Sequence, residues 1–174
     1  MPKAEKVKYI VEHCSAGYGP VESILNYHRN VKGWKNPGYH VIIDLDGRIN
    51  YVHDFDKIAN GVRNHNHECL HVCYIGGVSK DNYNKAVDTR TDLQKISILK
   101  VEIQMIQWLI DNGKKDCDTN LMILGHRDFS PDKNLDGMIS SNERIKECPS
   151  FDTIPEKYWI GATSQLQLLP FNRK

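Results

Sequence analysis

Residues 39–53 have the sequence YHVIIDLDGRINYVH and carry the clearest structural signal in the chain. Two apolar runs, Tyr39 to Leu45 and Arg48 to His53, flank the dipeptide Asp46-Gly47. Asp-Gly between alternating apolar residues is typical of a two-residue turn that joins antiparallel strands. The stretch therefore predicts a β-hairpin, and so the beginning of a sheet.

Strand-like and helix-like segments alternate on both sides of this hairpin. The further strands are expected at Lys8–His13, Leu70–Ile75 and Leu121–Leu124, and the helices at Val21–Arg29 and Thr91–Asn112. The apolar stripe of the longer helix is expected to consist of Ile96, Leu99, Ile103, Ile106 and Ile110, with Gly113 as the stop. This order predicts an α/β fold with a central mixed β-sheet flanked by helices.

Length and charge limit the classes of protein to consider. The chain has 174 residues, the size of one domain, and we expect a monomer with a single domain over residues 1–174. Lys and Arg number 23 against 22 Asp and Glu, so no basic excess favours nucleic-acid binding. No apolar run approaches the roughly 20 residues that cross a bilayer. The first residues lack the apolar core of a signal peptide, so we expect synthesis in the cytoplasm.

Three residues far apart in the sequence are candidate metal ligands. His13 and His126 each lie at the end of an expected strand, and Cys148 precedes Pro149, which suits the first turn of a helix. Two imidazoles and one thiolate leave the fourth position of a tetrahedral zinc site open, as catalytic zinc sites do. From spacing alone the alternative stays open, because a histidine at a strand end is more often a polar residue with no metal.

The strings around these residues form an ordered set. They are VEHCSA (11–16), GW (33–34) with PGYHVII (37–43), VCYIGG (72–77), GHRD (125–128) and CPSFD (148–152). Together they resemble the zinc-dependent N-acetylmuramoyl-L-alanine amidases, the family of phage lysis amidases and animal peptidoglycan recognition proteins. The resemblance covers about residues 7–152. It implies one α/β domain and a zinc ion held by His13, His126 and Cys148.

The same resemblance implies roles for two further residues. Tyr39 matches a family tyrosine that hydrogen-bonds the zinc-bound water or the developing oxyanion, and Lys146 matches a lysine that presents positive charge to that oxyanion. Family members often carry a histidine in the loop that corresponds to Ala59–Val62, where this chain has Gly61. We expect either that Asn64, His65 or His67 supplies the substrate contact instead, or that the preference for the stem peptide differs.

His65, His67, Cys69, His71 and Cys73 share one parity along the expected strand. Residues on one face of a strand line up about 7 Å apart and do not converge, so this set is a poor second metal site. We expect Leu70, Val72 and Tyr74 on one side of a covered strand and His71 and Cys73 on the other. Cys14, Cys69, Cys73 and Cys117 are expected to be small buried groups.

Residues 132–143 fit the twelve-position pattern of a calcium-binding loop. The expected ligands are Asp132, Asn134, Asp136, Met138 through its carbonyl, Ser140 and Glu143, with Gly137 at the sharp turn. A helix is expected after the loop, from Ser141 to Glu147. Pro131 disfavours a helix before it, so an Asp- and Asn-rich surface turn is the alternative.

These features favour an enzyme that hydrolyses the amide between N-acetylmuramic acid and L-alanine in peptidoglycan, with zinc and a structural calcium as its metals. A phage or prophage endolysin that reaches the wall after release fits best. The alternatives are an amidase that recycles wall fragments in the cytoplasm and a recognition module that binds peptidoglycan without cleaving it. The cysteine ligand, which recognition-only relatives typically lack, is present as Cys148.

Overall fold

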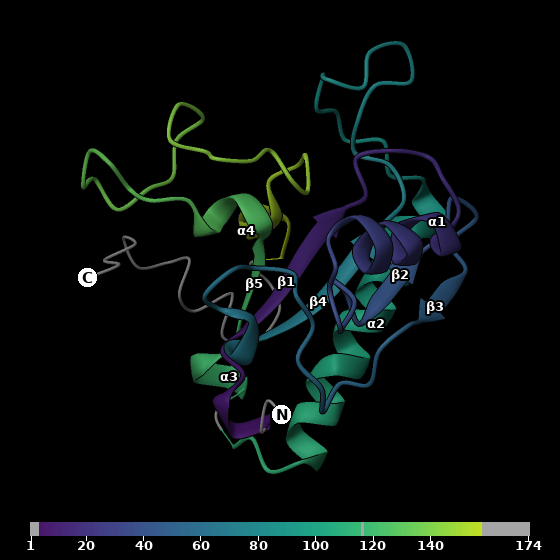
Figure 1. Cartoon of the computed structure of the whole chain (residues 1–174). Helices are drawn as coiled ribbons and strands as arrows, with labels where there is room; N and C mark the ends of the chain where they lie inside the picture. The colour runs from purple at the N-terminus through teal and green to yellow at the C-terminus, as the bar shows by residue number, and fades with distance from the viewer. Residues whose placement is uncertain (1–3, 116, 158–174) are drawn as a thin grey trace.

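The computed structural model describes residues 4–115 and 117–157, which build a five-stranded sheet between helices (Figure 1). The strands are β1 (Tyr9–Cys14), β2 (Val41–Ile43), β3 (Ile49–Tyr51), β4 (Cys69–Tyr74) and β5 (Met122–Gly125). Their order is β3-β2-β4-β1-β5. The predicted hairpin is present as antiparallel β2 and β3. The predicted two-residue turn at Asp46-Gly47 is wrong, because residues 44–48 join the strands and the backbone N–H of Gly47 donates to the carbonyl of Asp44. The other neighbours pair in parallel. The predicted mixed sheet is confirmed.

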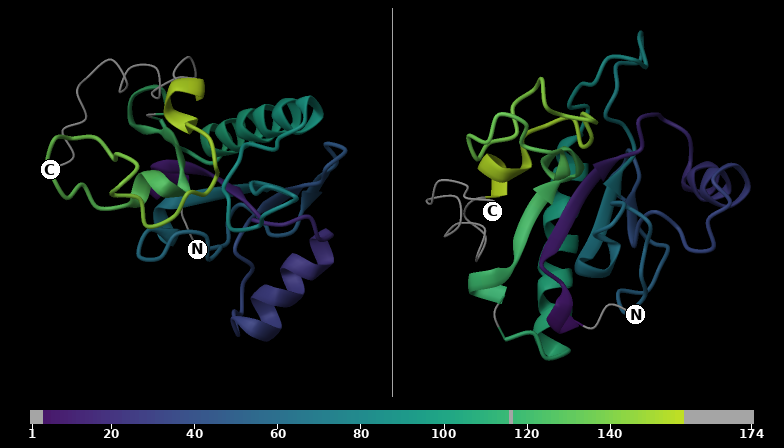
Figure 2. Two further views of the ribbon diagram at one scale, coloured as in Figure 1. Left: turned by 90° about the horizontal axis from the view of Figure 1, so that it is seen from above. Right: turned by 60° about the vertical axis from the view of Figure 1, so that its left-hand side comes forward.

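Helices cover both faces of the sheet. In Figure 2, α2 (Asp92–Asp111) lies against one face, and α1 (Val21–Asn26) with the π-helix η2 (Tyr27–Val31) lies on the other side. The helical segment that begins at Val21 thus extends two residues beyond the predicted end, but its winding changes from α to π at Tyr27. The shorter elements are α3 (Cys117–Asn120), α4 (Thr153–Lys157) and the 3-10 segments η1 (Ala4–Lys6), η3 (Asn66–Glu68) and η4 (His126–Phe129).

The start of α2 is fixed by its first residues. The Thr91 hydroxyl accepts the backbone N–H of Gln94, and the Gln94 side chain accepts the backbone N–H of Thr91, which forms a capping box. The Gln94 amide also donates to the carbonyl of Ile75, and the Ser97 hydroxyl donates to the carbonyl of Gly47. These bonds set the rotation of the helix over the sheet.

The predicted apolar stripe of α2 is wrong for three of its five residues, whereas Ile106 does pack against the core. The residues that face the core are Ile98, Val101, Met105 and Leu109, whereas Ile96, Ile103 and Ile110 are 51%, 55% and 50% exposed. Apolar residues surround this helix on most sides, so hydrophobic spacing alone does not choose the buried side. The polar contacts of Gln94 and Ser97 with distant loops choose it.

The two sides of β4 separate as predicted. Leu70, Val72 and Tyr74 belong to the main core with α2, while Cys69 and Cys73 belong to two smaller clusters on the opposite face. His71 is fully buried. Cys14, Cys69 and Cys73 are buried, but Cys117 is only half-buried.

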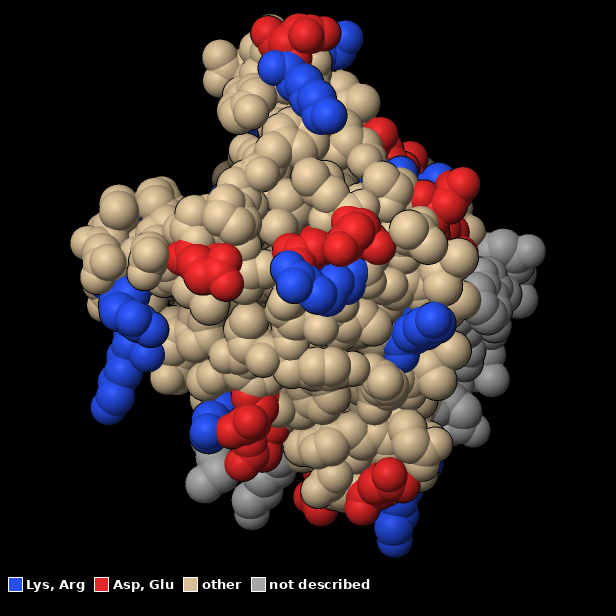
Figure 3. All heavy atoms as spheres, turned by 90° about the vertical axis from the view of Figure 1, so that its right-hand side faces the viewer, with Lys and Arg blue, Asp and Glu red and all other residues tan. Residues whose placement is uncertain are grey.

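Acidic and basic side chains are interleaved on the face shown in Figure 3, where neither sign forms a continuous patch. Within the described part of the chain, no helix is long and apolar enough to cross a membrane. The end of the single domain predicted for residues 1–174 lies outside the described residues, because these stop at Lys157.

Candidate active site

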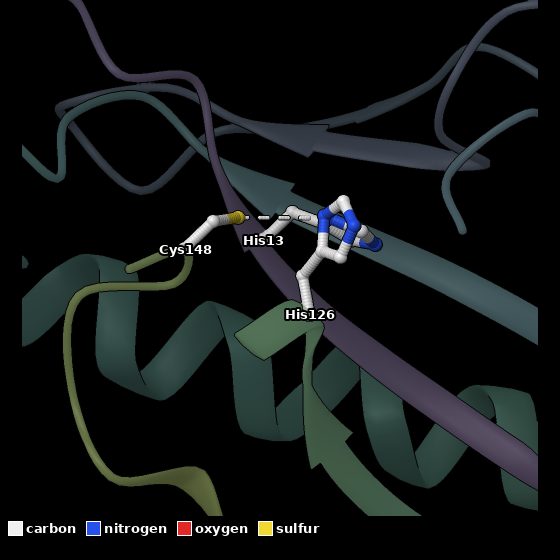
Figure 4. Close-up of side chains that lie close together, drawn as sticks. All are labelled: His13, His126 and Cys148. Carbon is white, nitrogen blue, oxygen red and sulfur yellow. Dashed lines mark hydrogen bonds between the residues drawn. The ribbon is translucent and has the colours of Figure 1, made fainter. Parts of the chain in front are cut away.

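His13, His126 and Cys148 come together at one end of the sheet (Figure 4). One ligand atom from each lies within 4.8 Å of the others, and no other group of His, Cys, Asp and Glu in residues 4–115 and 117–157 meets that condition. His13 lies on β1, and His126 follows β5 directly. The two strands pair in parallel with Glu12 opposite Gly125, so the next residues of both strands emerge side by side. The predicted neighbourhood of the three residues is confirmed.

Cys148 is brought to the strand ends by bonds of its own segment. The backbone N–H of Arg127, the residue after His126, donates to the carbonyl of Cys148 at 2.7 Å. The Tyr74 hydroxyl donates to the carbonyl of Pro149 at 2.8 Å. A Cβ atom on Gly125 would lie 2.6 Å from Cδ of Pro149, so only glycine lets this segment approach β5.

The position predicted for Pro149 is wrong, since α4 begins at Thr153 and Pro149 lies in the turn before it. In this turn the Ser150 hydroxyl donates to the carbonyl of Gly77. The half-buried thiol of Cys148 is thus held by the surrounding backbone instead of by a helix.

The atoms of the cluster are oriented toward one another. The Cys148 Sγ lies 3.7 Å from Nδ1 of His13, and it accepts the backbone N–H of Cys14 at 3.3 Å. The rings of His13 and His126 have centroids 4.8 Å apart. The second nitrogen of His13, Nε2, lies 3.1 Å from Nδ1 of His71. His13 therefore presents one nitrogen to the thiol and the other to His71.

The donor set fits a zinc ion. With Zn–S near 2.3 Å and Zn–N near 2.0 to 2.1 Å, a tetrahedral site separates sulfur and nitrogen by about 3.6 Å, close to the distance between Cys148 and His13. Burial, and then the charge of Lys146, lower the pKa of His126 to about 4. Burial, and then His126, lower the pKa of His13 well below its usual value. Both imidazoles are therefore neutral at pH 7, as metal ligands must be.

The thiol of the cluster needs a cation to ionise. The contact with the Cys14 thiol, and then burial, raise the pKa of Cys148 well above its usual value, whereas the backbone N–H of Cys14 acts in the opposite direction. A coordinated metal ion deprotonates such a thiol, and two neutral imidazoles leave the positive charge of the ion available for this. The chemistry of the three groups thus agrees with their geometry.

Tyr39 lies in the loop before β2, with its ring centroid 5.0 Å from that of His13. Burial, and then the nearby thiols of Cys73 and Cys148, raise the pKa of its hydroxyl well above the usual value. Tyr39 therefore keeps its proton and can donate a hydrogen bond at any working pH. The predicted place of this residue on a strand is wrong by two residues, since β2 begins at Val41.

A groove runs from Tyr39 toward α1. It has a volume of about 380 Å³ and is lined by Ser15, Gly17, Gly19, Ser23, Ile24, Tyr27, His28 and Tyr39. His28 stacks on Trp34 and contacts Tyr39 edge-on, and its Nδ1 accepts the backbone N–H of Gly38. No pattern in the sequence singles out His28, so its place beside Tyr39 was not predicted.

Lys146 is exposed and lies two residues before Cys148 in the chain, and its charge lowers the pKa of both His13 and His126. Asn64, His65 and His67 precede β4, and the register places the first residue of β4 beside Tyr9, four residues before His13. His65 packs against Phe129 of η4, and His67 is exposed. Their predicted contact with substrate stays a prediction.

The predicted calcium loop forms a compact turn of its own. The Glu143 carboxylate accepts backbone N–H groups of Lys133, Asn134 and Ser140. Asp132 accepts those of Leu135 and Gly137. The helix predicted from Ser141 to Glu147 is wrong, because this segment forms turns. Glu143 is bonded back across the loop and does not serve the first turn of a helix.

Comparison with known proteins identifies the family. The family model described as N-acetylmuramoyl-L-alanine amidase matches residues 3–149. The endolysin of Klebsiella phage KP32 is 27% identical over 161 residues, which cover 90% of this chain and 88% of that protein. Bumblebee PGRP-SA has the same fold, with a TM-score of 0.64 at 14% identity, over 90% of this chain and 83% of that one.

A second solved structure with this fold is an endolysin, the N-acetylmuramoyl-L-alanine amidase LysCS from Clostridium intestinale. It aligns with a TM-score of 0.62 at 16% identity, over 95% of this chain and 86% of that one. The family match includes His13, His126 and Cys148 together with Tyr39 and Lys146. The chain therefore belongs to the N-acetylmuramoyl-L-alanine amidase family, the amide hydrolases of peptidoglycan.

Proposed function

We propose that this amidase is a zinc-dependent endolysin that releases L-alanine-linked stem peptides from N-acetylmuramic acid. The observation that carries the proposal is the convergence of His13, His126 and Cys148 within 4.8 Å, beside Tyr39 at the end of a groove. The relation to the phage endolysin over nearly its whole length supports a role in lysis. We further propose that residues 1–174 form one catalytic domain that acts as a monomer.

His13, His126 and Cys148 would hold the zinc ion. Zinc supplies Lewis acidity, which polarises a carbonyl group and makes a water molecule acidic at neutral pH. The residues of the chain contribute orientation and charge. The groove from Tyr39 to α1 would hold the substrate with its amide next to the cluster.

Tyr39 and Lys146 would stabilise the charge that develops on the amide oxygen. The Tyr39 hydroxyl stays protonated and donates to the oxyanion of the tetrahedral intermediate. Lys146 adds a positive charge from the exposed side of the cluster. A donor aimed at the oxyanion favours the transition state over the planar amide, which raises kcat more than it lowers KM.

The test is a product analysis with purified sacculi. The protein is incubated with peptidoglycan, with and without a chelator, and new alanine amino termini are counted against new reducing sugar ends. We expect alanine termini only, lost with chelator and restored by zinc. New reducing ends would indicate a glycosidase, and no product of either kind would indicate a recognition module. Preference for soluble muropeptides over sacculi would favour recycling over lysis.

Calcium binding by residues 132–143 stays a prediction. Two features of the loop agree with it: the positive φ of Leu135 and Gly137, and the bond from the Gly137 N–H to Asp132. A calcium ion there would order the segment before Lys146 and Cys148. Calorimetric titration of zinc-loaded protein with calcium tests it, with Asp132→Ala as the variant that should lose the heat. Absence of heat, with a melting temperature that calcium leaves unchanged, would contradict it.

A further inference from the structure

His71 is a buried histidine that contacts the candidate zinc ligand His13. Both side chains are almost fully inaccessible to solvent, and Nδ1 of His71 lies 3.1 Å from Nε2 of His13. Only one of these two nitrogens can carry the hydrogen of the bond. If Nδ1 of His13 presents its lone pair toward Cys148, a neutral His13 carries its hydrogen on Nε2. His71 then accepts that hydrogen on Nδ1.

The surrounding backbone fixes the ring of His71. A Cβ atom on Gly61 would lie 2.5 Å from Nδ1 of His71 and 2.7 Å from Cγ and Cε1, so the ring rests against a bare glycine. The ring also stacks on that of His40, with an angle of 14° between the two planes. His40 donates from Nε2 to the carbonyl of Lys57, and its Nδ1 accepts the backbone N–H of His71. The ring has little freedom to turn away from His13.

The second nitrogen of His71 makes a histidine costly at this position, where an apolar residue would pack equally well. Nε2 of His71 is buried and has no hydrogen-bond partner among the described residues. A buried polar atom without a partner costs free energy that a phenylalanine or leucine would not. The bond to His13 is the one contact of the His71 ring that such a residue could not replace.

We propose that His71 is a positioning residue for His13. It accepts the Nε2 hydrogen of His13 and so keeps the Nδ1 lone pair aimed at the space between Cys148 and His126. Partners of this kind fix the tautomer and orientation of metal-bound histidines. The inference rests on the proposed zinc site, and Gly61 has a part in it, since a side chain at that position would displace the His71 ring.

Two variants of His71 separate the hydrogen bond from packing. His71→Asn keeps an acceptor on the γ carbon but removes the ring, and His71→Phe keeps the ring but removes the acceptor. His53→Phe is the matched control, because His53 contacts His40 and not the cluster. For each folded variant we would measure zinc affinity by competition with a chelating dye, and the absorption spectrum of the cobalt-substituted protein.

We expect His71→Phe to weaken zinc binding about 10- to 100-fold and to alter the cobalt spectrum. His71→Asn should stay within about threefold of the unchanged protein, as should the control. Equal affinity in His71→Phe and the unchanged protein would overturn the inference, and so would loss in His71→Asn with retention in His71→Phe. An unchanged protein that binds no zinc would overturn the proposed zinc site itself, which is a different result.

Discussion

The two faces of the central sheet are built for different purposes. On one face, the apolar side chains of β1, β2 and β4 pack against α2 and form the main core. On the other face lie His13, His71 and Tyr39, and the rings of His71 and Tyr39 both contact that of His13. Because side chains alternate along a strand, Glu12 and His13 of β1 point to opposite faces. Neighbouring residues of β1 thus contribute to different parts of the protein: Glu12 to the packed face, and His13 to the candidate zinc site.

The face of the sheet that packs against α2 also contains charged side chains, but these are buried and pair with one another. Nζ of Lys157 lies 3.0 Å from Oε2 of Glu102 on α2 and 3.3 Å from Oε1 of Glu12 on β1, and all three residues are buried. Arg90, which precedes α2, pairs at 2.7 Å with Glu156, which lies next to Lys157 on α4. These pairs attach α4 to the sheet, and so hold the segment that follows Cys148.

Removal of the thiol ligand should have the largest effect. In Cys148→Ser we expect activity on peptidoglycan to fall by well over about 100-fold, more than changes outside the ligand set produce. The free energy of unfolding of the zinc-free protein should change little, because the hydroxyl can accept the Cys14 N–H. Product release and urea unfolding in the presence of chelator measure the two. Activity within tenfold would show that Cys148 is not a ligand.

A change among the buried charges on the α2 face should lower stability and leave activity nearly unchanged. Lys157→Met leaves two buried carboxylates without their cation, which should cost about 3 to 5 kcal/mol in the free energy of unfolding. Activity of the folded protein at low temperature should stay close to normal. Urea unfolding provides the measurement, and Lys95→Met, at an exposed pair with Asp92, is the matched control with an effect below about 1 kcal/mol. A similar loss in both variants would contradict the role of the buried group.

Removal of the Tyr39 hydroxyl tests the chemistry of the candidate site without changing any of the three proposed zinc ligands. We expect Tyr39→Phe to lower kcat by about 100-fold with KM nearly constant, since in the proposed mechanism the lost donor acts on the oxyanion. Zinc affinity and the melting temperature should not change. Tyr83→Phe, on an exposed loop, is the control for loss of a tyrosine hydroxyl. A tyrosine that merely packs against His13 would show no such loss of kcat.

The smallest effect should come from a change in the loop of residues 132–143, which belongs to neither face of the sheet. Hydrogen bonds from Ser140, and then from Lys133 and Asn134, lower the pKa of Glu143 from 4.5 to about 2. A lowered pKa stabilises the folded protein above about pH 4.5, and this contribution is lost as the pH falls toward 2. The melting temperature of the unchanged protein should therefore exceed that of Glu143→Gln at pH 6, and the difference should shrink on acidification. A difference independent of pH would contradict this origin.

Most of the fold was predictable because its signals are local. The Asp46-Gly47 dipeptide locates the hairpin, although the turn itself runs from Asp44 to Gly47. Short apolar runs locate the other strands, and parallel strand ends bring His13 and His126 together. The buried side of α2 was not predictable, because Ile96 and Ile98 are equally apolar. The choice depends on bonds from Gln94 and Ser97 to residues that are distant in sequence.

The site shows the same limit. The parity of β4 placed His71 on the face of Cys73, but its partner His13 lies 58 residues away, and no local pattern reports that contact. A helix was predicted from Ser141 to Glu147, yet the carboxylate of Glu143 within it bonds back to Lys133 and Asn134. Residues whose partners come from other segments are those that the sequence leaves undecided.

The distance along the chain between the ligands has a consequence for the whole protein. His13 and Cys148 are 135 residues apart, so an ion bound by both joins the first strand to the turn before the last described helix. Such an ion binds only the folded chain, and contributes about 4 kcal/mol to stability when its concentration is 1,000 times Kd. Zinc would then stabilise the fold as well as take part in catalysis. An enzyme that loses its metal would lose heat resistance along with activity.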